Sequence, residues 1–251
     1  MHKEFTIRGA KAGKHVICEK PMAVSAQDCR EMIKACDDAG KMLSIGYRLH
    51  FEPYNQEMMR LGQKEVFGKV NKIDASNGFI MGPQTDPSIW RLNKELAGGG
   101  SLMDMGVYVV QGARYVMGQE PIAVTAREEI TRPDLFDEVE ETMFWTMEFP
   151  GGTTATCKTS YNGGGNHLRA DAEEGWFELS EAYRYGGMRG ATSKGKMTFP
   201  QVNQQALQMD DFAYCIMNNK PTRVPGEEGL KDLKAIEAIY RAAKSGKREL
   251  V

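Results

Sequence analysis

The chain has no long apolar run and no excess of charge of either sign. No hydrophobic stretch approaches the roughly 20 residues that a membrane helix needs, and no apolar core follows Met1-His2-Lys3-Glu4 as it would in a signal peptide. The formal net charge is −2, with 26% charged residues, so the sequence favours neither a nucleic acid nor a membrane surface as partner. We expect a globular cytoplasmic protein that takes a small neutral or weakly polar ligand.

Cysteine and histidine are scarce and show no spacing typical of a metal site. The number of cysteines is odd and they lack the close paired spacing of a disulfide scaffold, so we expect most of them to be buried thiols. A third absence concerns nucleotide binding, because no Gly-x-Gly-x-x-Gly opens the chain. The cysteines are Cys18, Cys29, Cys36, Cys157 and Cys215.

The first 48 residues alternate between helical and strand patterns. A helix is expected over 3–12, a buried strand over 15–18, a helix from Ser25 to Gly40, and a second strand over 42–47. This order predicts two parallel strands joined by a crossover helix, the repeating unit of a doubly wound sheet. Residues 1–48 are therefore interpreted as the C-terminal half of a Rossmann dinucleotide-binding domain.

Residues 49–251 are predicted to form a second domain. Turn glycines separate segments of β-rich composition, which predict a large, mostly antiparallel open sheet covered by helices. The fold class is α/β plus α+β. Strands are expected over 70–79, 122–128, 142–149, 153–160 and 176–179, and helices over 53–62, 101–117, 204–218 and 227–245, the last a candidate to pack back on the first domain.

Three chemically active side chains form the candidate site. Asp104 and Tyr108 stand four apart in an expected helix that follows Gly98-Gly99-Gly100, so both point the same way. The glycines let the backbone pass close to a ligand or to another backbone. Lys20 follows an expected parallel strand, at the edge where open sheets bind ligands. A carboxylate, a phenol and an ammonium can together move a proton on and off a hydroxyl group, and the ammonium would favour the phenolate.

Each of these residues also has a structural interpretation. Glu19 and Lys20 can end the strand in solvent, and Asp104 with Tyr108 can form a buried hydrogen-bonded pair that stabilises the helix. Most glycine clusters are loops, so Gly98-Gly99-Gly100 is ambiguous as well.

Other candidates carry weaker signals. Trp90-Arg91 can stack on a ligand or form a surface cation–π contact. Tyr47, Arg48 and His50 follow a strand end that suits substrate hydroxyls, and are otherwise loop residues. Tyr185, with Tyr183 two positions before it, is by itself an aromatic strand residue.

Five motifs, taken together in order and spacing, resemble the glucose-fructose oxidoreductase, inositol dehydrogenase and rhizopine-catabolism (Gfo/Idh/MocA) oxidoreductase family. The resemblance covers nearly the whole chain and is greatest for the glucose-fructose oxidoreductase branch. The motifs are Val16-Ile17-Cys18-Glu19-Lys20-Pro21, Ile45-Gly46-Tyr47-Arg48, Trp90-Arg91-Leu92, Ala97-Gly98-Gly99-Gly100-Ser101-Leu102-Met103-Asp104-Met105-Gly106-Val107-Tyr108, and Asn219-Lys220-Pro221 with Pro225-Gly226-Glu227-Glu228-Gly229.

The resemblance implies an NAD(P)-dependent oxidoreductase that moves hydride between nicotinamide and a sugar or polyol. It implies Lys20, Asp104 and Tyr108 as catalytic residues, with tyrosine where many members have histidine. The implied cofactor contacts are Glu19, Lys20, Pro21, Trp90 and Arg91, with His2 near the nicotinamide. The implied substrate contacts are Tyr47, Arg48, Asp104, Tyr108 and Tyr185.

The same resemblance implies a homo-oligomer, dimer or tetramer, formed through the sheet of the second domain. It leaves NADP and NAD open, and it leaves a periplasmic location open if an export signal precedes these residues. The family's glycine fingerprint lies before residue 1, so we expect weak cofactor binding. Two alternatives remain: a redox-assisted, NAD-dependent glycosidase, and a non-catalytic oligomeric remnant.

Overall fold

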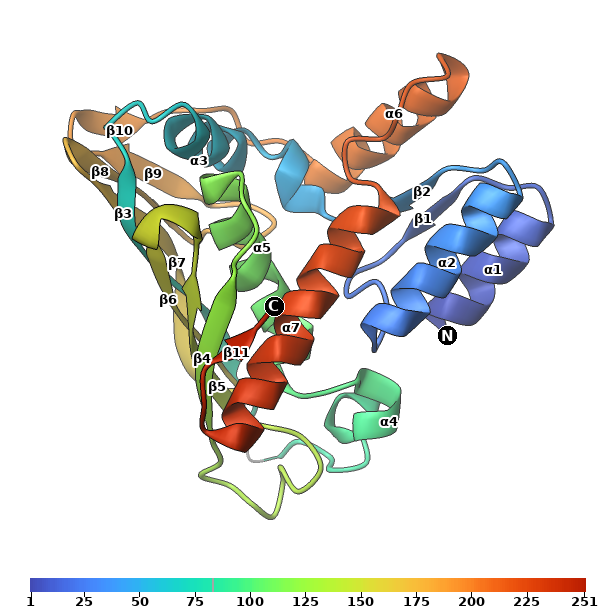
Figure 1. Cartoon of the computed structure of the whole chain (residues 1–251), viewed down its shortest axis with the longest axis horizontal. Coiled ribbons are helices and arrows are strands. Elements are labelled where there is room, and N and C mark those ends of the chain that lie inside the picture. The colour runs from blue at the N-terminus through green and yellow to red at the C-terminus, as the bar shows by residue number, and fades with distance from the viewer. Residues whose placement is uncertain (83) are drawn as a thin grey trace. The chain divides into compact units, whose positions relative to one another are not determined.

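The computed structural model describes residues 1–82 and 84–251, and the contacts of the chain divide it into two compact units. Unit 1 comprises Met1–Glu52 and Val202–Lys234. Unit 2 comprises Pro53–Gln201 and Ala235–Val251. Figure 1 shows the elements of both units, which are described separately below.

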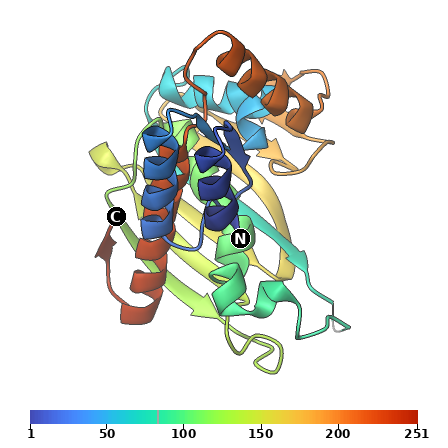
Figure 2. The ribbon, with the colours of Figure 1, turned by 90° about the vertical axis from the view of Figure 1, so that its right-hand side faces the viewer.

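Unit 1 contains the predicted pair of parallel strands. The chain runs through α1 (His2–Lys11), β1 (Val16–Cys18), α2 (Ala26–Asp38) and β2 (Leu43–Ile45), and β1 pairs with β2 in parallel. The Ser25 side chain caps α2 by accepting the backbone N–H of Asp28, as its position predicts. Helices α1 and α2 lie side by side (Figure 2).

The remaining elements of unit 1 come from two distant parts of the chain. The short helix η1 (Arg48–Phe51) follows β2, and α6 (Gln204–Met217) packs against it. The sequence predicted that this helix covers the antiparallel sheet. Instead it belongs to unit 1, where its buried residues are Gln204, Gln208, Phe212 and Cys215, and Gln204 accepts a hydrogen bond from Arg48 of η1. The first turns of α7 (Gly226–Ser245) complete the unit.

Unit 2 is built on a sheet of nine strands in the order β10-β9-β8-β7-β3-β6-β5-β4-β11. Only β3 and β6 are parallel neighbours, so the prediction of a mostly antiparallel sheet is confirmed. The strands are β3 (Val70–Ile80), β4 (Ala123–Glu129), β5 (Thr142–Glu148), β6 (Thr154–Ser160), β7 (Asn162–Ala172), β8 (Gly175–Ser180), β9 (Arg189–Thr192), β10 (Gly195–Met197) and β11 (Glu249–Leu250).

One face of this sheet is the core of unit 2. Alternate residues such as Ile73, Ala155 and Leu168 are buried, as expected of a sheet that is covered on one side. Helix α5 (Val107–Met117) packs on this face against β3, β6 and β7, and α3 (Pro53–Gln63) packs on α5 (Figure 1). This packing places the start of α5 against the middle of the sheet.

The longest strand that the sequence did not predict is β7. Its Gly163-Gly164-Gly165 resembles a turn, yet this run pairs with the end of β3. A Cβ at Gly165 would lie 2.2 Å from Ser76 Oγ on β3, so the strand needs glycine for close approach. The short strands β9, β10 and β11 carry too few residues for a periodic signal and were missed as well.

The helix expected over 101–117 is divided into two parts. Leu102–Gly106 forms a π-helical turn, η3, and the α-helix begins at Val107. The short helices η2 (Trp90–Leu92), α4 (Lys94–Ala97) and η4 (Pro150–Gly152) were not predicted. No helix within residues 1–82 and 84–251 combines the length and apolar character needed to cross a bilayer.

Candidate functional site

In unit 1, the predicted Glu-Lys-Pro motif directly follows β1. Glu19 Oε2 accepts the backbone N–H of Lys20 at 3.2 Å, which fixes the start of the turn. His2 Nδ1 donates to the carbonyl of Pro21 at 2.9 Å, so the first turn of α1 lies beside the motif. Lys20 thus lies just past the carboxyl end of the parallel pair, and its role at the site stays a prediction.

Tyr47 and Arg48 lie just past the end of β2 and are almost fully buried. Their exposed fractions are 1% and 4%, and Arg48 donates a hydrogen bond to Gln204 of α6. Burial of the neighbouring His50 lowers the pKa of its imidazole, and Arg223 adds to this effect, so its ring is held neutral. Contact of Tyr47 and Arg48 with substrate stays a prediction.

In unit 2, Asp104 lies within the π-helical turn, where Tyr161 and Arg91 contact its carboxylate. Its Oδ2 accepts the hydroxyl of Tyr161 at 3.0 Å and lies 3.4 Å from Nε of Arg91. The Asp104 side chain is 24% exposed, so the carboxylate is held by the protein and remains accessible. π-Helical turns are rare and frequently occur at functional sites.

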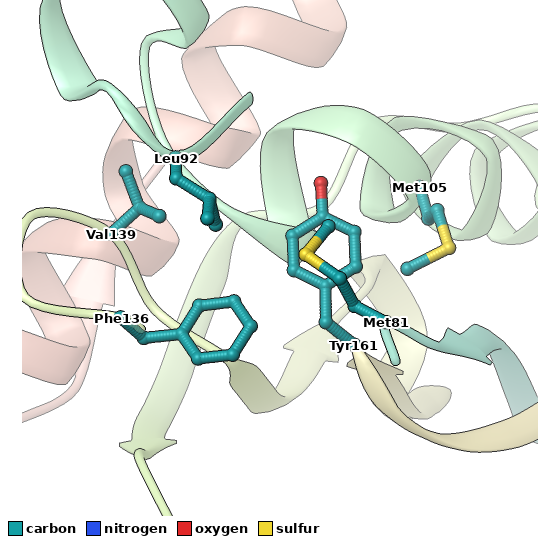
Figure 3. Packing of buried hydrophobic residues seen from close by; sticks show 6 residues of the cluster. All are labelled: Met81, Leu92, Met105, Phe136, Val139 and Tyr161. Carbon is teal, nitrogen blue, oxygen red and sulfur yellow. The ribbon is translucent and has the colours of Figure 1, made fainter. Parts of the chain in front are cut away.

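Tyr161 is fully buried and donates its hydroxyl to the carboxylate of Asp104. Its ring lies in an apolar cluster with Met81, Leu92, Met105, Phe136 and Val139, and its hydroxyl points out of that cluster (Figure 3). Burial, together with the charge of Asp104, raises the pKa of the Tyr161 phenol far above its ordinary value. The hydroxyl therefore stays protonated and acts as a fixed donor to Asp104.

Trp90 and Arg91 form the cation–π pair that the sequence allowed. The guanidinium carbon of Arg91 lies 4.5 Å from the centre of the Trp90 ring. The same arginine faces Asp104, so the pair is anchored to the candidate site. Trp90 is 53% exposed.

Tyr108 occupies the first turn of α5, just after the π-helical turn, and is partly buried. Its ring centre lies 6.3 Å from that of Tyr183, in a tilted arrangement. Tyr183 is held in turn by Asn166 Oδ1, which accepts its backbone N–H, and by the carbonyl of His167, which accepts its hydroxyl. Tyr185 is 64% exposed.

The triple glycine serves close backbone packing. Gly98 has φ +81° and ends α4 in the left-handed conformation. A Cβ at Gly99 would lie 1.9 Å from the hydroxyl of Tyr240, and one at Gly100 would lie 2.0 Å from the carbonyl oxygen of Glu140. The sequence left open whether these glycines let the backbone approach a ligand or another part of the protein. In the structure they let it approach another part of the protein.

Three supporting residues of this site were not singled out from the sequence. Tyr161 and Glu140 come from the connections that flank β5, β6 and β7, and the sequence marks Tyr183 only as a strand aromatic. No local pattern marks them, because their role depends on strand pairing. Among residues 1–82 and 84–251, no group of three or more side chains is arranged to hold a metal ion, and the five cysteines are free and buried.

Comparison with known families identifies the chain. Residues 1–47 match the NAD-binding Rossmann-fold domain of the Gfo/Idh/MocA oxidoreductase family, and residues 55–178 match the family's C-terminal domain. The chain belongs to this family, as its motifs predicted.

Solved structures and curated proteins agree with this assignment. A crystal structure of aldose-aldose oxidoreductase from Caulobacter crescentus, complexed with glycerol, is 43% identical, with a TM-score of 0.95 over 100% of this chain and 76% of that chain. D-xylose 1-dehydrogenase [NADP(+)] of Haloarcula marismortui is 27% identical over 98% of this chain and 70% of its own length. Levoglucosan dehydrogenase in complex with NADH and levoglucosan shares the fold, with a TM-score of 0.86 at 20% identity, over 100% of this chain and 77% of its own.

Proposed function

We propose that this protein is an NAD(P)-dependent oxidoreductase that transfers hydride between nicotinamide and a hydroxyl or carbonyl carbon of a sugar or polyol. The observation that carries the proposal is that Asp104, held by Tyr161 and Arg91, lies four residues before Tyr108 at the start of α5. The family relatives whose names state an activity include two NADP-dependent D-xylose 1-dehydrogenases and a D-glucoside 3-dehydrogenase, which supports a sugar as substrate.

The residues present fit the nicotinamide end of a dinucleotide. Lys20 stands at the carboxyl end of the parallel strands β1 and β2, the edge at which open α/β sheets bind their ligands. Trp90 offers an exposed aromatic face, and Arg91 a positive charge. We assign Glu19, Lys20, Pro21, Trp90 and Arg91 to cofactor contacts on this basis, with His2 near the nicotinamide.

In the proposed reaction, a bound oxidised nicotinamide supplies the hydride acceptor. Tyr108 takes the proton from the substrate hydroxyl as the carbon–hydrogen bond breaks. Asp104 accepts a hydrogen bond from a neighbouring hydroxyl and orients the sugar, and Lys20 favours the phenolate form of Tyr108 through its positive charge. In the opposite direction, Tyr108 returns a proton to the carbonyl oxygen.

The remaining substrate contacts are proposed from position. Tyr185 is exposed two residues after Tyr183, whose ring lies beside Tyr108. Tyr47 and Arg48 follow β2 at the carboxyl edge of the parallel pair. We further propose a homo-oligomer, dimer or tetramer, formed through the sheet of unit 2.

Steady-state assays with NAD+ and NADP+ against a set of aldoses and polyols test the proposal. We expect substrate-dependent formation of reduced nicotinamide, measured by its absorbance, and its loss in Tyr108→Phe. Tyr214→Phe is the matched control, because this tyrosine is 50% exposed on α6 and belongs to unit 1. Release of an aglycone from a glycoside with no net change in nicotinamide absorbance would contradict a dehydrogenase.

A further inference from the structure

Glu140 is a buried carboxyl group with no part in the chemistry described above. It lies two residues before β5 begins, and its exposed fraction is 4%. Burial raises the pKa of this carboxyl group above its ordinary value, and hydrogen bonds from Gly100, Leu102 and Tyr240 oppose the rise. A buried carboxylate is costly unless several donors satisfy it, so its partners indicate what it does.

Its partners lie on the segment that leads to Asp104. The backbone N–H of Gly100 donates to Glu140 Oε2 at 2.9 Å, and that of Leu102 donates to Oε1 at 2.8 Å. Between them, the N–H of Ser101 donates to the backbone carbonyl of Glu140 at 3.2 Å. Three consecutive backbone donors are thus held by one residue.

This arrangement replaces the usual local cap of a helix. The first N–H groups of a helix lack partners within it, and a Ser at the N-cap normally accepts one of them. Ser101 occupies that position but makes no side-chain cap, and its hydroxyl lies 3.3 Å from that of Thr159 on β6. A cap from Glu140 ties the segment to the sheet rather than to its own first turn.

Tyr240 on α7 also donates a hydrogen bond to the carboxyl group of Glu140. Its hydroxyl lies 3.1 Å and 3.2 Å from the two oxygens of Glu140 and fits against Gly99, where a Cβ would lie 1.9 Å away. Burial, followed by the charge of Glu140, raises the pKa of the Tyr240 phenol far above its ordinary value, so it acts only as a donor.

The held segment continues directly into the candidate site. The N–H of Asp104 donates to the carbonyl of Gly100 at 3.1 Å, and Tyr108 follows on the next turn. Tyr161 fixes the Asp104 carboxylate from the end of β6. Both ends of this short segment are therefore anchored to the same sheet, Gly100 through Glu140 and the carboxylate through Tyr161.

We propose that Glu140, held by Tyr240, is a positioning residue that sets the place of Asp104 and Tyr108 for proton transfer. The proposal rests on the proposed function and deepens it, because it names residues that act on the reaction without touching substrate. Displacements of about 1 Å at catalytic groups can cost on the order of a hundredfold in rate.

The test compares three variants of the full chain. Glu140→Gln keeps the shape but turns an NH2 group toward a backbone donor. We expect kcat to fall about 10- to 100-fold with KM within about threefold. Tyr240→Phe removes only one donor and should lower kcat about two- to fivefold. This milder variant tests the proposal even if Glu140→Gln folds poorly.

Glu141→Gln is the matched control. Glu141 is the adjacent residue and is 0% exposed, but it accepts hydrogen bonds from Thr131 and Arg132 instead of the Gly100 segment. We expect Glu141→Gln to lower the melting temperature while kcat stays within about twofold of wild type. An equal loss of kcat in both glutamine variants would overturn the proposal.

Hydrogen exchange gives a readout that does not depend on turnover. In Glu140→Gln, amide exchange at Gly100–Asp104 should rise about tenfold or more, while β3 and β6 stay protected. Unchanged exchange in this segment, or equal acceleration throughout unit 2, contradicts the proposal. A wild-type chain without sugar-dependent turnover would instead overturn the proposed function, and exchange would still decide whether Glu140 holds the segment.

Discussion

The two units place their candidate residues by different means. In unit 1, Lys20 follows a three-residue strand, so its position depends on where β1 ends. In unit 2, Asp104 and Tyr108 depend on side chains from three other parts of the chain: Tyr161, Glu140 and Tyr240. A strand end is a local property of sequence, whereas a support built from distant residues is a tertiary one.

This difference predicts how tolerant each part is of mutation. Changes near Lys20 should affect the reaction mainly through the lysine itself. Changes around Asp104 should affect the reaction even when the mutated side chain is buried and remote from substrate. The following predictions test this contrast, in order of decreasing effect.

Tyr108→Phe should have the largest effect. Removing the hydroxyl removes the proposed proton acceptor, and we expect kcat to fall about 10²- to 10⁴-fold with the fold unchanged. Steady-state kinetics and circular dichroism measure the two quantities. Retention of more than a tenth of the wild-type kcat would show that Tyr108 does not transfer the proton.

Lys20→Met should come next. In the proposed mechanism the charge of Lys20 favours the phenolate of Tyr108, so we expect its loss to lower kcat about 10- to 100-fold at neutral pH. The pH–rate profile should move toward higher pH, because more base is then needed to form the phenolate. A lower rate with an unshifted profile would assign Lys20 to binding alone. Lys14→Met, in the exposed link before β1, is the control.

Gly99→Ala tests the support in unit 2. Its Cβ would meet the Tyr240 hydroxyl, so we expect a loss of about 1–3 kcal/mol in the free energy of unfolding. Gly164→Ala, where a Cβ meets nothing within 4 Å, is the control in the same unit. Chemical denaturation measures both, and equal losses would mean that the contact between Gly99 and Tyr240 is not what requires glycine.

Tyr161→Phe removes the donor to Asp104 and keeps the aromatic packing. We expect kcat to fall about three- to tenfold, because Arg91 remains beside the carboxylate. Phe136→Leu, in the same apolar cluster, should lower stability more than rate. The reverse pattern would show that Tyr161 serves only as packing.

The smallest effect concerns pH and the neighbouring pair Glu140 and Glu141. Burial raises the pKa of Glu141, but hydrogen bonds from Thr131 and the charge of Arg132 outweigh it, so its folded pKa lies below its ordinary value. Its stabilising contribution is present above about pH 4.3 and is lost as pH falls through the folded pKa. Glu141→Gln should therefore reduce the loss of stability between pH 7 and pH 3.

The contribution of Glu140 to stability should change with pH in the opposite direction to that of Glu141. Its folded pKa is raised, so the folded state holds the proton more tightly and this group contributes less stability as pH rises. Thermal unfolding of Glu140→Gln across the same pH range should show a steeper loss of stability toward acid than wild type. Identical slopes in the two glutamine variants would contradict the assigned directions.

The sequence predicted most elements and their order. The parallel pair β1–β2, the helix that Ser25 caps, and five of the nine strands of the large sheet follow from hydrophobic periodicity and from capping and turn residues. Strand β7 was missed because its glycines signal a turn locally, although they serve close contact with β3. The division of the expected helix at Val107 carried no local signal either.

For the candidate site, the sequence by itself determined the chemical groups and the family: Lys20 after a strand, Asp104 and Tyr108 four apart, and five motifs in order. Only the tertiary structure decided what holds them. Glu140, Tyr161 and Tyr240 reach Gly100–Asp104 through strand pairing and helix packing across long separations in sequence. Such contacts leave no periodic pattern, because their geometry depends on the whole sheet rather than on neighbouring residues.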